Sequence, residues 1–278
     1  MYIPFSAFNA LPYFMEYQDK SPLVHCMTNH VVQNFTANVL LATGGSPAMI
    51  PDIQECGEFT MIASGLLVNV GTLTERAANA MLHSAKIAHE TGTPWVLDPV
   101  GIGPALYYRT GIVNQLLQYQ PSVIRGNPAE IMVLAGVDAK SKGVDSEENA
   151  KEAFEYAENV ARQFKTIVVM TGEEDIITNG DKSYIVSVGT EKLTKVTGTG
   201  CSLSALVAGM ISSTEDTLEA AATACYIVAL SGQIASEKGD KNGSGLGSFA
   251  VQYLDELSLM TSEKLLEIAK SEGAFDQF

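Results

Sequence analysis

The sequence predicts an α/β fold in which a mostly parallel central sheet carries helices on both of its faces. Short runs rich in Val, Ile and Leu alternate with longer segments whose apolar residues recur at helical spacing. Because these strand and helix patterns alternate, neighbouring strands are expected to run parallel, with helices as the crossovers. No linker, repeat or low-complexity tract interrupts residues 1–278, so we expect a single domain.

The predicted strands are short apolar runs, most of which end at Gly, Pro or a polar residue. The last two flank the sequence NGD at residues 179–181, which predicts a β-hairpin. The expected strands are residues 23–28, 48–50, 66–70, 95–97, 122–124, 166–170, 176–178 and 183–188.

The predicted helices show apolar residues three and four positions apart, and some carry residues that favour helix ends. Thr74 is expected to cap a helix that continues to about Thr91, and Pro128 suits a first helical turn. Residues 218–236 are apolar nearly all round, which indicates a buried central helix. The least charged stretch, residues 220–236, is too short to span a bilayer. The other expected helices are residues 30–42, 106–118, 146–164, 201–212, 246–257 and 262–272.

The composition indicates a globular, acidic protein. The hydrophobic fraction is 46%, and the net charge of −15 argues against nucleic acid or an anionic membrane as a partner. The four cysteines show neither a C-x-x-C pair nor zinc-site spacing, so free thiols in a reducing compartment are expected. The first twenty residues lack a signal-peptide pattern, and we therefore expect a cytoplasmic protein.

The sharpest local motif is a glycine-rich turn, TGTGCS at residues 197–202, which opens a helix of small residues. A helix N-terminus offers unpaired N–H groups, and Gly198 and Gly200 would let these donors approach an anion closely. The alternative is a tight turn before a close-packed helix. The chain contains no G-x-x-x-x-G-K-[ST] motif, which excludes a P-loop, and no complete G-x-G-x-x-G dinucleotide motif.

Polar residues follow several predicted strands. Asp98, Arg125 and Thr171 each come directly after one, and such ends should converge beside a ligand crevice. Asp98 and Glu130 could hold Mg²⁺ there, directly or through water. Arg125, with Asn127 beside it, would offer a planar cation to phosphate oxygens. Each has a structural alternative: a turn for Asp98, the helix dipole for Glu130 and the protein surface for Arg125.

Asn and Thr residues gather where the first predicted strand meets the first predicted helix, in residues 25–38. They suggest polar groups fixed for a neutral ligand, with Asn29 among the candidates; helix caps are the alternative. Met49 closely follows the GSP sequence at residues 45–47 and could line an apolar pocket or fill the core.

Taken together, these motifs resemble the hydroxyethylthiazole kinases, thiamine-pathway enzymes of the ribokinase-like superfamily. The resemblance covers about residues 20–260 and implies transfer of the ATP γ-phosphate to the primary alcohol of 4-methyl-5-(2-hydroxyethyl)thiazole. It also implies magnesium dependence and a homotrimer with sites between neighbouring subunits. The motifs are PLVHCMTN (22–29), NFTAN (34–38), GSPAM (45–49), DPVG (98–101), RGNPAE (125–130) and GTGC (198–201).

The resemblance also assigns roles to individual positions. Three residues would contact the thiazole: Met49, Gly198 and Asn29. Arg125 and Thr171 would contact ATP. The acidic positions associated with magnesium and phosphate are Asp98 and Glu130.

Cys201 occupies the position at which ribokinase-like enzymes generally place an aspartate as base for the acceptor hydroxyl. The thiazole kinases have cysteine there too. A thiol at a helix N-terminus can have a lowered pKa, which would make the thiolate accessible near neutral pH. Because phosphoryl transfer depends chiefly on positioning and charge neutralisation, we hypothesise that Cys201 assists but is dispensable. The main-chain amides from Gly198 to Gly200 would hold the transferring phosphoryl group.

Two alternative functions remain open. One is a kinase for hydroxymethylpyrimidine or another small alcohol, against which the Gly-Cys ending and the Asn-rich segment argue. The other is a catalytically silent nucleotide-binding regulator on the same fold. The joint presence of Asp98, Arg125, Glu130 and Cys201 argues against that second alternative.

Overall fold

The computed structural model of the chain describes residues 2–137 and 147–272. Within them, strands pair into one sheet in the order β1-β9-β8-β7-β6-β5-β4-β2-β3. Each of these pairings is parallel except those of β8, which runs antiparallel to β7 and β9. The strands are β1 (Tyr2–Pro4), β2 (Leu23–Met27), β3 (Ser46–Ala48), β4 (Gly65–Asn69), β5 (Trp95–Asp98), β6 (Val123–Gly126), β7 (Ile167–Met170), β8 (Asp175–Thr178) and β9 (Ser183–Val186).

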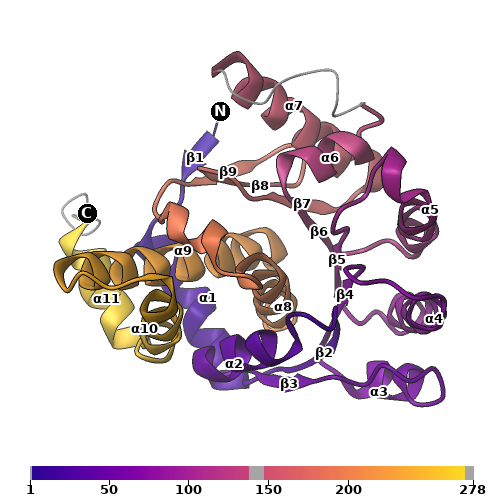
Figure 1. The fold of residues 1–278 in the computed structure, drawn as a ribbon, viewed down its shortest axis with the longest axis horizontal. Coiled ribbons are helices and arrows are strands. Elements are labelled where there is room, and N and C mark those ends of the chain that lie inside the picture. The colour runs from indigo at the N-terminus through magenta and orange to yellow at the C-terminus, as the bar shows by residue number, and fades with distance from the viewer. Residues whose placement is uncertain (1, 138–146, 273–278) are drawn as a thin grey trace.

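Helices cover both faces of this sheet (Figure 1), which confirms the predicted fold class. One layer contains α3 (Cys56–Ile62), α4 (Glu75–Thr91), α5 (Tyr107–Leu116), α6 (Pro128–Leu134) and α7 (Glu147–Phe164). The other layer contains α1 (Ala7–Lys20), α2 (Gln33–Thr43), α8 (Thr199–Ile211), α9 (Thr217–Lys241), α10 (Leu246–Ser258) and α11 (Ser262–Ser271). Short 3₁₀ helices lie at η1 (Pro104–Leu106), η2 (Leu117–Tyr119) and η3 (Glu191–Lys195).

Several local predictions are confirmed in detail. The hydroxyl of Thr74 accepts a hydrogen bond from the Ala77 N–H at 3.2 Å and so caps α4. Pro128 is the first residue of α6, where its missing N–H costs nothing. Strands β8 and β9 form the expected antiparallel hairpin. The first residue of the predicted helix 146–164 lies outside the described residues.

Other elements differ from the prediction. The predicted strand 48–50 is wrong, because β3 lies at Ser46–Ala48, where Ser46 pairs with Leu23 of β2. Helix α2 begins three residues later than predicted, since a turn first brings the Val32 N–H to the Asn29 carbonyl. The prediction also missed β1, α1 and α3 and the 3₁₀ helices η1 and η3.

The longest helix, α9, packs against α1, α8 and α10. With 25 residues, α9 is longer than the predicted helix 218–236. The prediction that this segment is too short to span a bilayer is therefore wrong for the helix as a whole. In the described part of the chain α9 alone is long and apolar enough to cross a membrane. However, 83% of its most apolar window is buried inside the protein. The apolar surface of α9 is therefore core surface.

Helix α8 lies close against the sheet, and this packing places its first turn beside the strand ends. Gly65, the first residue of β4, has no side chain to hold the helix away. A Cβ atom there would lie 2.6 Å from the main-chain oxygen of Ala208 in α8. Since that oxygen belongs to the helix backbone, only a shift of the helix or the strand could make room.

We therefore expect Gly65→Ala to lower the free energy of unfolding by about 1–3 kcal/mol, the usual cost of overpacking. Gly111→Ala is the matched control. Gly111 lies in α5, and a Cβ atom there would meet nothing within 4 Å. Because alanine favours helices, the control should be neutral or up to about 1 kcal/mol more stable. Urea unfolding measures both, and equal effects would contradict the close α8 packing.

Candidate active site

The ends of β5, β6 and β7 bring three predicted site residues together. Arg125 Nη2 donates a hydrogen bond to Thr171 Oγ1 at 2.6 Å. Arg125 Nη1 lies 3.8 Å from Asp98 Oδ2, and the Arg125 side chain is only 12% exposed. The predicted convergence of these strand ends is therefore confirmed.

The carboxylate of Asp98 is completely buried. Its Oδ2 accepts hydrogen bonds from Asn69 Nδ2 and Ser204 Oγ, both at 2.7 Å. Its Oδ1 has no hydrogen-bond partner among the described residues. Burial raises the pKa of Asp98 to about 6, although Arg125 acts in the opposite direction and Glu130 adds to the increase.

Asn69 and Ser204 are site residues that the sequence analysis missed. Asn69 is a lone polar residue in the apolar run of β4, and this was a usable signal because a buried amide requires partners. Its Oδ1 accepts hydrogen bonds from Asn29 Nδ2 and from the Gly71 N–H, both at 3.0 Å. Ser204 lies among other small residues of α8, and nothing in the sequence distinguishes it from them.

Both glycines of the predicted turn lie in contact with other elements. Gly198, the residue before α8, has a φ of +100°, and a Cβ atom there would lie 3.2 Å from Phe35 and Val32. A Cβ atom on Gly200 would lie 2.7 Å from Arg125 Nη2. The guanidinium group of Arg125 therefore lies directly over the first turn of α8, where the helix has its partial positive charge.

Cys201, in the same turn, is half-buried. Asn29 Nδ2 donates a weak hydrogen bond to its Sγ at 3.5 Å. Burial raises the pKa of the Cys201 thiol, and the nearby Asp98 raises it further. The expectation of a lowered pKa is therefore wrong, because it considered the helix terminus without the burial and the neighbouring carboxylate.

Glu130 and Asn127 form the start of α6. Asn127 Oδ1 accepts a hydrogen bond from the Glu130 N–H at 2.9 Å, and Glu130 Oε2 accepts one from the Asn127 N–H at 2.8 Å. Glu130 Oε1 accepts another from the Gly101 N–H, also at 2.8 Å. Glu130 thus connects the loop after Asp98 to α6, while Asn127 is exposed and caps that helix.

The residues present fit a magnesium ion that is shared with a phosphate. Within residues 2–137 and 147–272, no three His, Cys, Asp or Glu side chains gather into a site that could hold a metal alone. Mg²⁺ usually binds through one or two carboxylates together with water and substrate phosphates. The unpartnered Oδ1 of Asp98 is a suitable carboxylate oxygen, and Glu130 keeps unused lone pairs.

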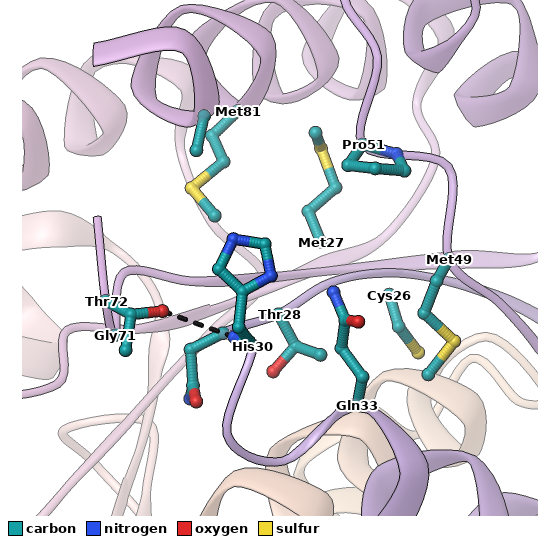
Figure 2. A pocket seen from close by; sticks show the side chains of 12 residues that line it. Cys26, Met27, Thr28, His30, Gln33, Met49, Pro51, Gly71, Thr72 and Met81 are labelled. Atoms are coloured by element: carbon teal, nitrogen blue, oxygen red, sulfur yellow. Dashed lines mark hydrogen bonds between the residues drawn. The ribbon is translucent and has the colours of Figure 1, made fainter. Parts of the chain in front are cut away.

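A pocket lies at the ends of β2 and β4, next to this polar group. Figure 2 shows the thioether side chains of Met27, Met49 and Met81 around it, with the ring of His30 among them. Asn29 also lines the pocket, so the structure brings together two of the three predicted thiazole contacts. The third, Gly198, is not part of its lining. The lining residues are Cys26, Met27, Thr28, Asn29, His30, Gln33, Met49, Pro51, Gly71, Thr72, Ala77 and Met81.

The mostly parallel sheet with helices on both faces and the glycine-rich turn that opens α8 give the chain a ribokinase-like fold. A ribokinase-like superfamily protein from Enterococcus faecalis V583 shares the fold, with a TM-score of 0.66 at 14% identity over 95% of this chain and 96% of its own. The profile of the hydroxyethylthiazole kinase family matches residues 14–263. The chain belongs to the hydroxyethylthiazole kinase family.

Individual relatives agree with this assignment and confirm the resemblance predicted from the motifs. The hydroxyethylthiazole kinase of Leptospira borgpetersenii serovar Hardjo-bovis (strain JB197) is 47% identical over 249 residues, which are 90% of this chain and 92% of the relative. That of Pectobacterium atrosepticum is 46% identical over 261 residues, 94% and 97% of the two chains. The structure of the Pyrococcus horikoshii OT3 protein has a TM-score of 0.84 at 34% identity, covering 93% of this chain and 95% of its own.

Gly200→Ala tests the contact between Arg125 and α8. The new methyl group would displace the guanidinium group, whereas the backbone could stay in place because only the end of a flexible side chain must move. We expect KM for ATP to rise about tenfold or more, the loss expected when a hydrogen bond to a charged group is broken. The melting temperature should fall as well, because Arg125 also compensates the buried charge of Asp98, and Gly111→Ala serves again as control. An unchanged KM for ATP would contradict this role of Gly200.

The buried carboxylate predicts a pH dependence of stability. The pKa of Asp98 rises from 3.8 to about 6 on folding, so the folded protein binds this proton more tightly than the unfolded chain. Relative to Asp98→Asn, the wild type should therefore gain stability as the pH falls from about 7 towards 4. The pKa of Asp175 is also raised to about 6. Because this residue is present in both proteins, its contribution to the pH dependence cancels. Urea unfolding without added metal measures the difference, and a difference independent of pH would contradict it.

Proposed function

We propose that the protein transfers the γ-phosphoryl group of ATP to the primary hydroxyl of 4-methyl-5-(2-hydroxyethyl)thiazole, as a step of thiamine metabolism. Family membership supports this activity. The observation that carries the mechanism is the position of Arg125. It lies over the first turn of α8, bound to Thr171 and paired with Asp98. The pocket of Asn29 and Met49 lies beside this arrangement.

The phosphate-binding part of the site combines a cation with a helix N-terminus. Arg125 and Thr171 contact ATP in this proposal, with the exposed Asn127 at the edge of the same site. The main-chain amides of the turn from Gly198 to Gly200 hold the transferring phosphoryl group. Fixed donors of this kind stabilise the charge that develops on the phosphoryl oxygens, because they need no reorganisation during the reaction.

Mg²⁺ is part of the proposal, with Asp98 and Glu130 as the residues that would hold it. When bound, the ion would neutralise part of the phosphate charge. The support is the unpartnered Oδ1 of Asp98 and the position of Glu130, which acts on the pKa of Asp98. The buried hydrogen bonds to Asp98 Oδ2 keep the carboxylate in one orientation.

The alcohol binds in the pocket that Met49 and Asn29 line, with Gly198 at its phosphoryl end. Polarisable methionine side chains suit a neutral sulfur-containing ring. A buried amide at Asn29 supplies a hydrogen-bonding group without adding charge. This lining favours a neutral heteroaromatic alcohol over a charged one, because burying a charged substrate would require an opposite charge in the pocket.

Cys201 supports the reaction without acting as a strong base. Its pKa is raised, so the thiol is protonated near neutral pH. A loose phosphoryl-transfer transition state needs little proton removal before the phosphorus bond forms, so positioning and charge neutralisation supply most of the rate. Cys201 then helps to orient the acceptor hydroxyl beside Asn29.

We also propose the domain organisation, the location and the oligomeric state of the enzyme. The whole chain acts as one ribokinase-like kinase domain in the cytoplasm, with neither nucleic acid nor membrane as a partner, which suits its net charge of −15. It forms a homotrimer with sites between neighbouring subunits. Large exposed apolar side chains support such contacts, among them Val31 near the pocket, 66% exposed, and Tyr107 after β5, 81% exposed.

The decisive experiment measures ADP release by the purified protein with Mg²⁺, ATP and a panel of small alcohols. Release that depends on the thiazole alcohol supports the proposal. A preference for hydroxymethylpyrimidine would select the alternative kinase, and ATP binding without turnover on any alcohol would select the silent regulator. Omitting Mg²⁺ tests the metal requirement in the same assay.

Substitutions at Cys201 test its role. We expect Cys201→Ser to keep turnover within about tenfold of the wild type, less than the roughly 100-fold or more that a general base typically contributes. Cys201→Asp should also remain active, because a carboxylate can take the same place. Steady-state kinetics and calorimetric binding of both substrates provide the measurements. Complete loss of turnover in Cys201→Ser with normal binding would show that the thiol is essential.

A further inference from the structure

Asn69 connects the alcohol pocket with the phosphate side of the site. It is the last residue of β4 and is completely buried. Its Oδ1 accepts hydrogen bonds from Asn29 Nδ2 and from the Gly71 N–H, and both of those residues line the pocket. Its Nδ2 donates to Asp98 Oδ2 at 2.7 Å. One side chain thus contacts both halves of the site.

The chemistry of the partners fixes the orientation of this amide. An ionised carboxylate only accepts hydrogen bonds and a main-chain N–H only donates them. The Asn69 nitrogen must therefore face Asp98, and its oxygen must face Gly71 and Asn29. Asn29 is fixed in turn, since its Oδ1 accepts from the Val31 N–H at 3.1 Å. The chain of donors runs in one direction, from Val31 to Asp98.

The same contacts decide which oxygen of Asp98 stays free. Asn69 and Ser204 both donate to Oδ2, whereas Oδ1 has no partner among the described residues. Two donors on a single oxygen prevent the carboxylate from turning. Partners of this kind orient metal-binding carboxylates, and their loss typically costs about 10–100-fold in metal affinity or activity.

We propose that Asn69 is a positioning residue for the phosphoryl transfer. Its nitrogen holds Asp98 so that Oδ1 would stay free for the metal ion that accompanies ATP, and its oxygen holds Asn29 in the wall of the alcohol pocket. This inference rests on the proposed function, which supplies the two substrates. The structural alternative is a buried amide that only satisfies its own hydrogen bonds and those of its neighbours.

Asn69→Asp separates the two halves of this role. The substitution keeps the shape of the side chain and an oxygen for Asn29 and Gly71. It also puts a second carboxyl group against the buried Asp98, so the two groups share one proton and Asp98 loses its free negative charge. We expect affinity for the thiazole alcohol, measured by calorimetry without ATP or metal, to stay within about threefold of the wild type. By contrast, kcat should fall about 10–100-fold, and the Mg²⁺ concentration for half-maximal rate should rise about tenfold.

Asn69→Ala removes both the donor to Asp98 and the acceptor for Asn29. The affinity for the alcohol should therefore fall as well, by about tenfold. Ser204→Ala removes only the second donor to Asp98 and should lower kcat without changing alcohol affinity. Combined with Asn69→Asp, it should cost less than the product of the single effects, because both side chains act on one oxygen. If Asn69→Ala does not fold, the Asp and Ser204 variants decide the question.

The matched control is Thr43→Val. Thr43 is a buried residue at the far end of α2, where its hydroxyl shares a 2.9 Å hydrogen bond with Tyr17. The variant loses a buried hydrogen bond, as the Asn69 variants do, and should lower the melting temperature with kcat and alcohol affinity unchanged. A folded Asn69→Asp protein with wild-type kcat and Mg²⁺ dependence would overturn the proposal, as would equal kinetic losses in Thr43→Val.

Assays of the wild type distinguish a failure of the proposed function from a failure of this inference. If it phosphorylates a different alcohol, the thiazole assignment fails, and the same variants are compared with that alcohol. If it phosphorylates none, melting with a non-hydrolysable ATP analogue replaces kcat. Wild-type protein should then need about tenfold less Mg²⁺ than Asn69→Asp for the same stabilisation. Equal Mg²⁺ requirements would overturn the role of Asn69 without involving any alcohol.

Discussion

The burial of the Asp98 carboxylate under α8 is the constraint on which the arrangement of the site depends. Removing an ionised carboxylate from water costs several kcal/mol unless nearby groups compensate. Arg125 provides the opposite charge, and Asn69 and Ser204 provide hydrogen bonds. These groups come from β4, β6 and α8, so the requirements of a single carboxylate bring three elements together. The close contact at Gly65, which lets α8 approach the sheet, is part of the same arrangement.

The charge of the protein as a whole is unfavourable for a nucleotide, since a net charge of −15 repels phosphate. The site therefore needs positive potential at short range, where screening by salt is weakest. The absence of a side chain at Gly200 lets two sources of positive potential lie close together. The guanidinium group of Arg125 lies against the first turn of α8. The full charge of the side chain and the partial charge of the helix terminus then act at one place.

Sequence reasoning predicted the parts of the fold that follow from local periodicity and parallel pairing. The convergence of three strand ends followed directly, since the carboxyl ends of parallel strands share one edge. Sequence reasoning failed where tertiary contacts determine the local structure. Helix α1 contains Pro12, which argues against a helix, but a capping box at Ser6 and the burial of Phe14 and Tyr17 stabilise it. The side-chain partners of Asn69, Asp98 and Asn29, lie 29 and 40 residues away along the chain, so no local sequence pattern indicates them.

The position of Cys201 relative to Asp98 explains how a cysteine can replace an aspartate in this turn. A second ionised carboxylate beside a buried one is unfavourable, because like charges at short distance disfavour each other. A protonated thiol avoids that cost and still accepts a hydrogen bond from Asn29. An aspartate at the same place would have its pKa raised by Asp98 and by burial, towards the range in which a general base works best. The surroundings thus allow either residue. Burial and Asp98 keep the thiol of Cys201 protonated, and they would raise the pKa of an aspartate and so make it a stronger base.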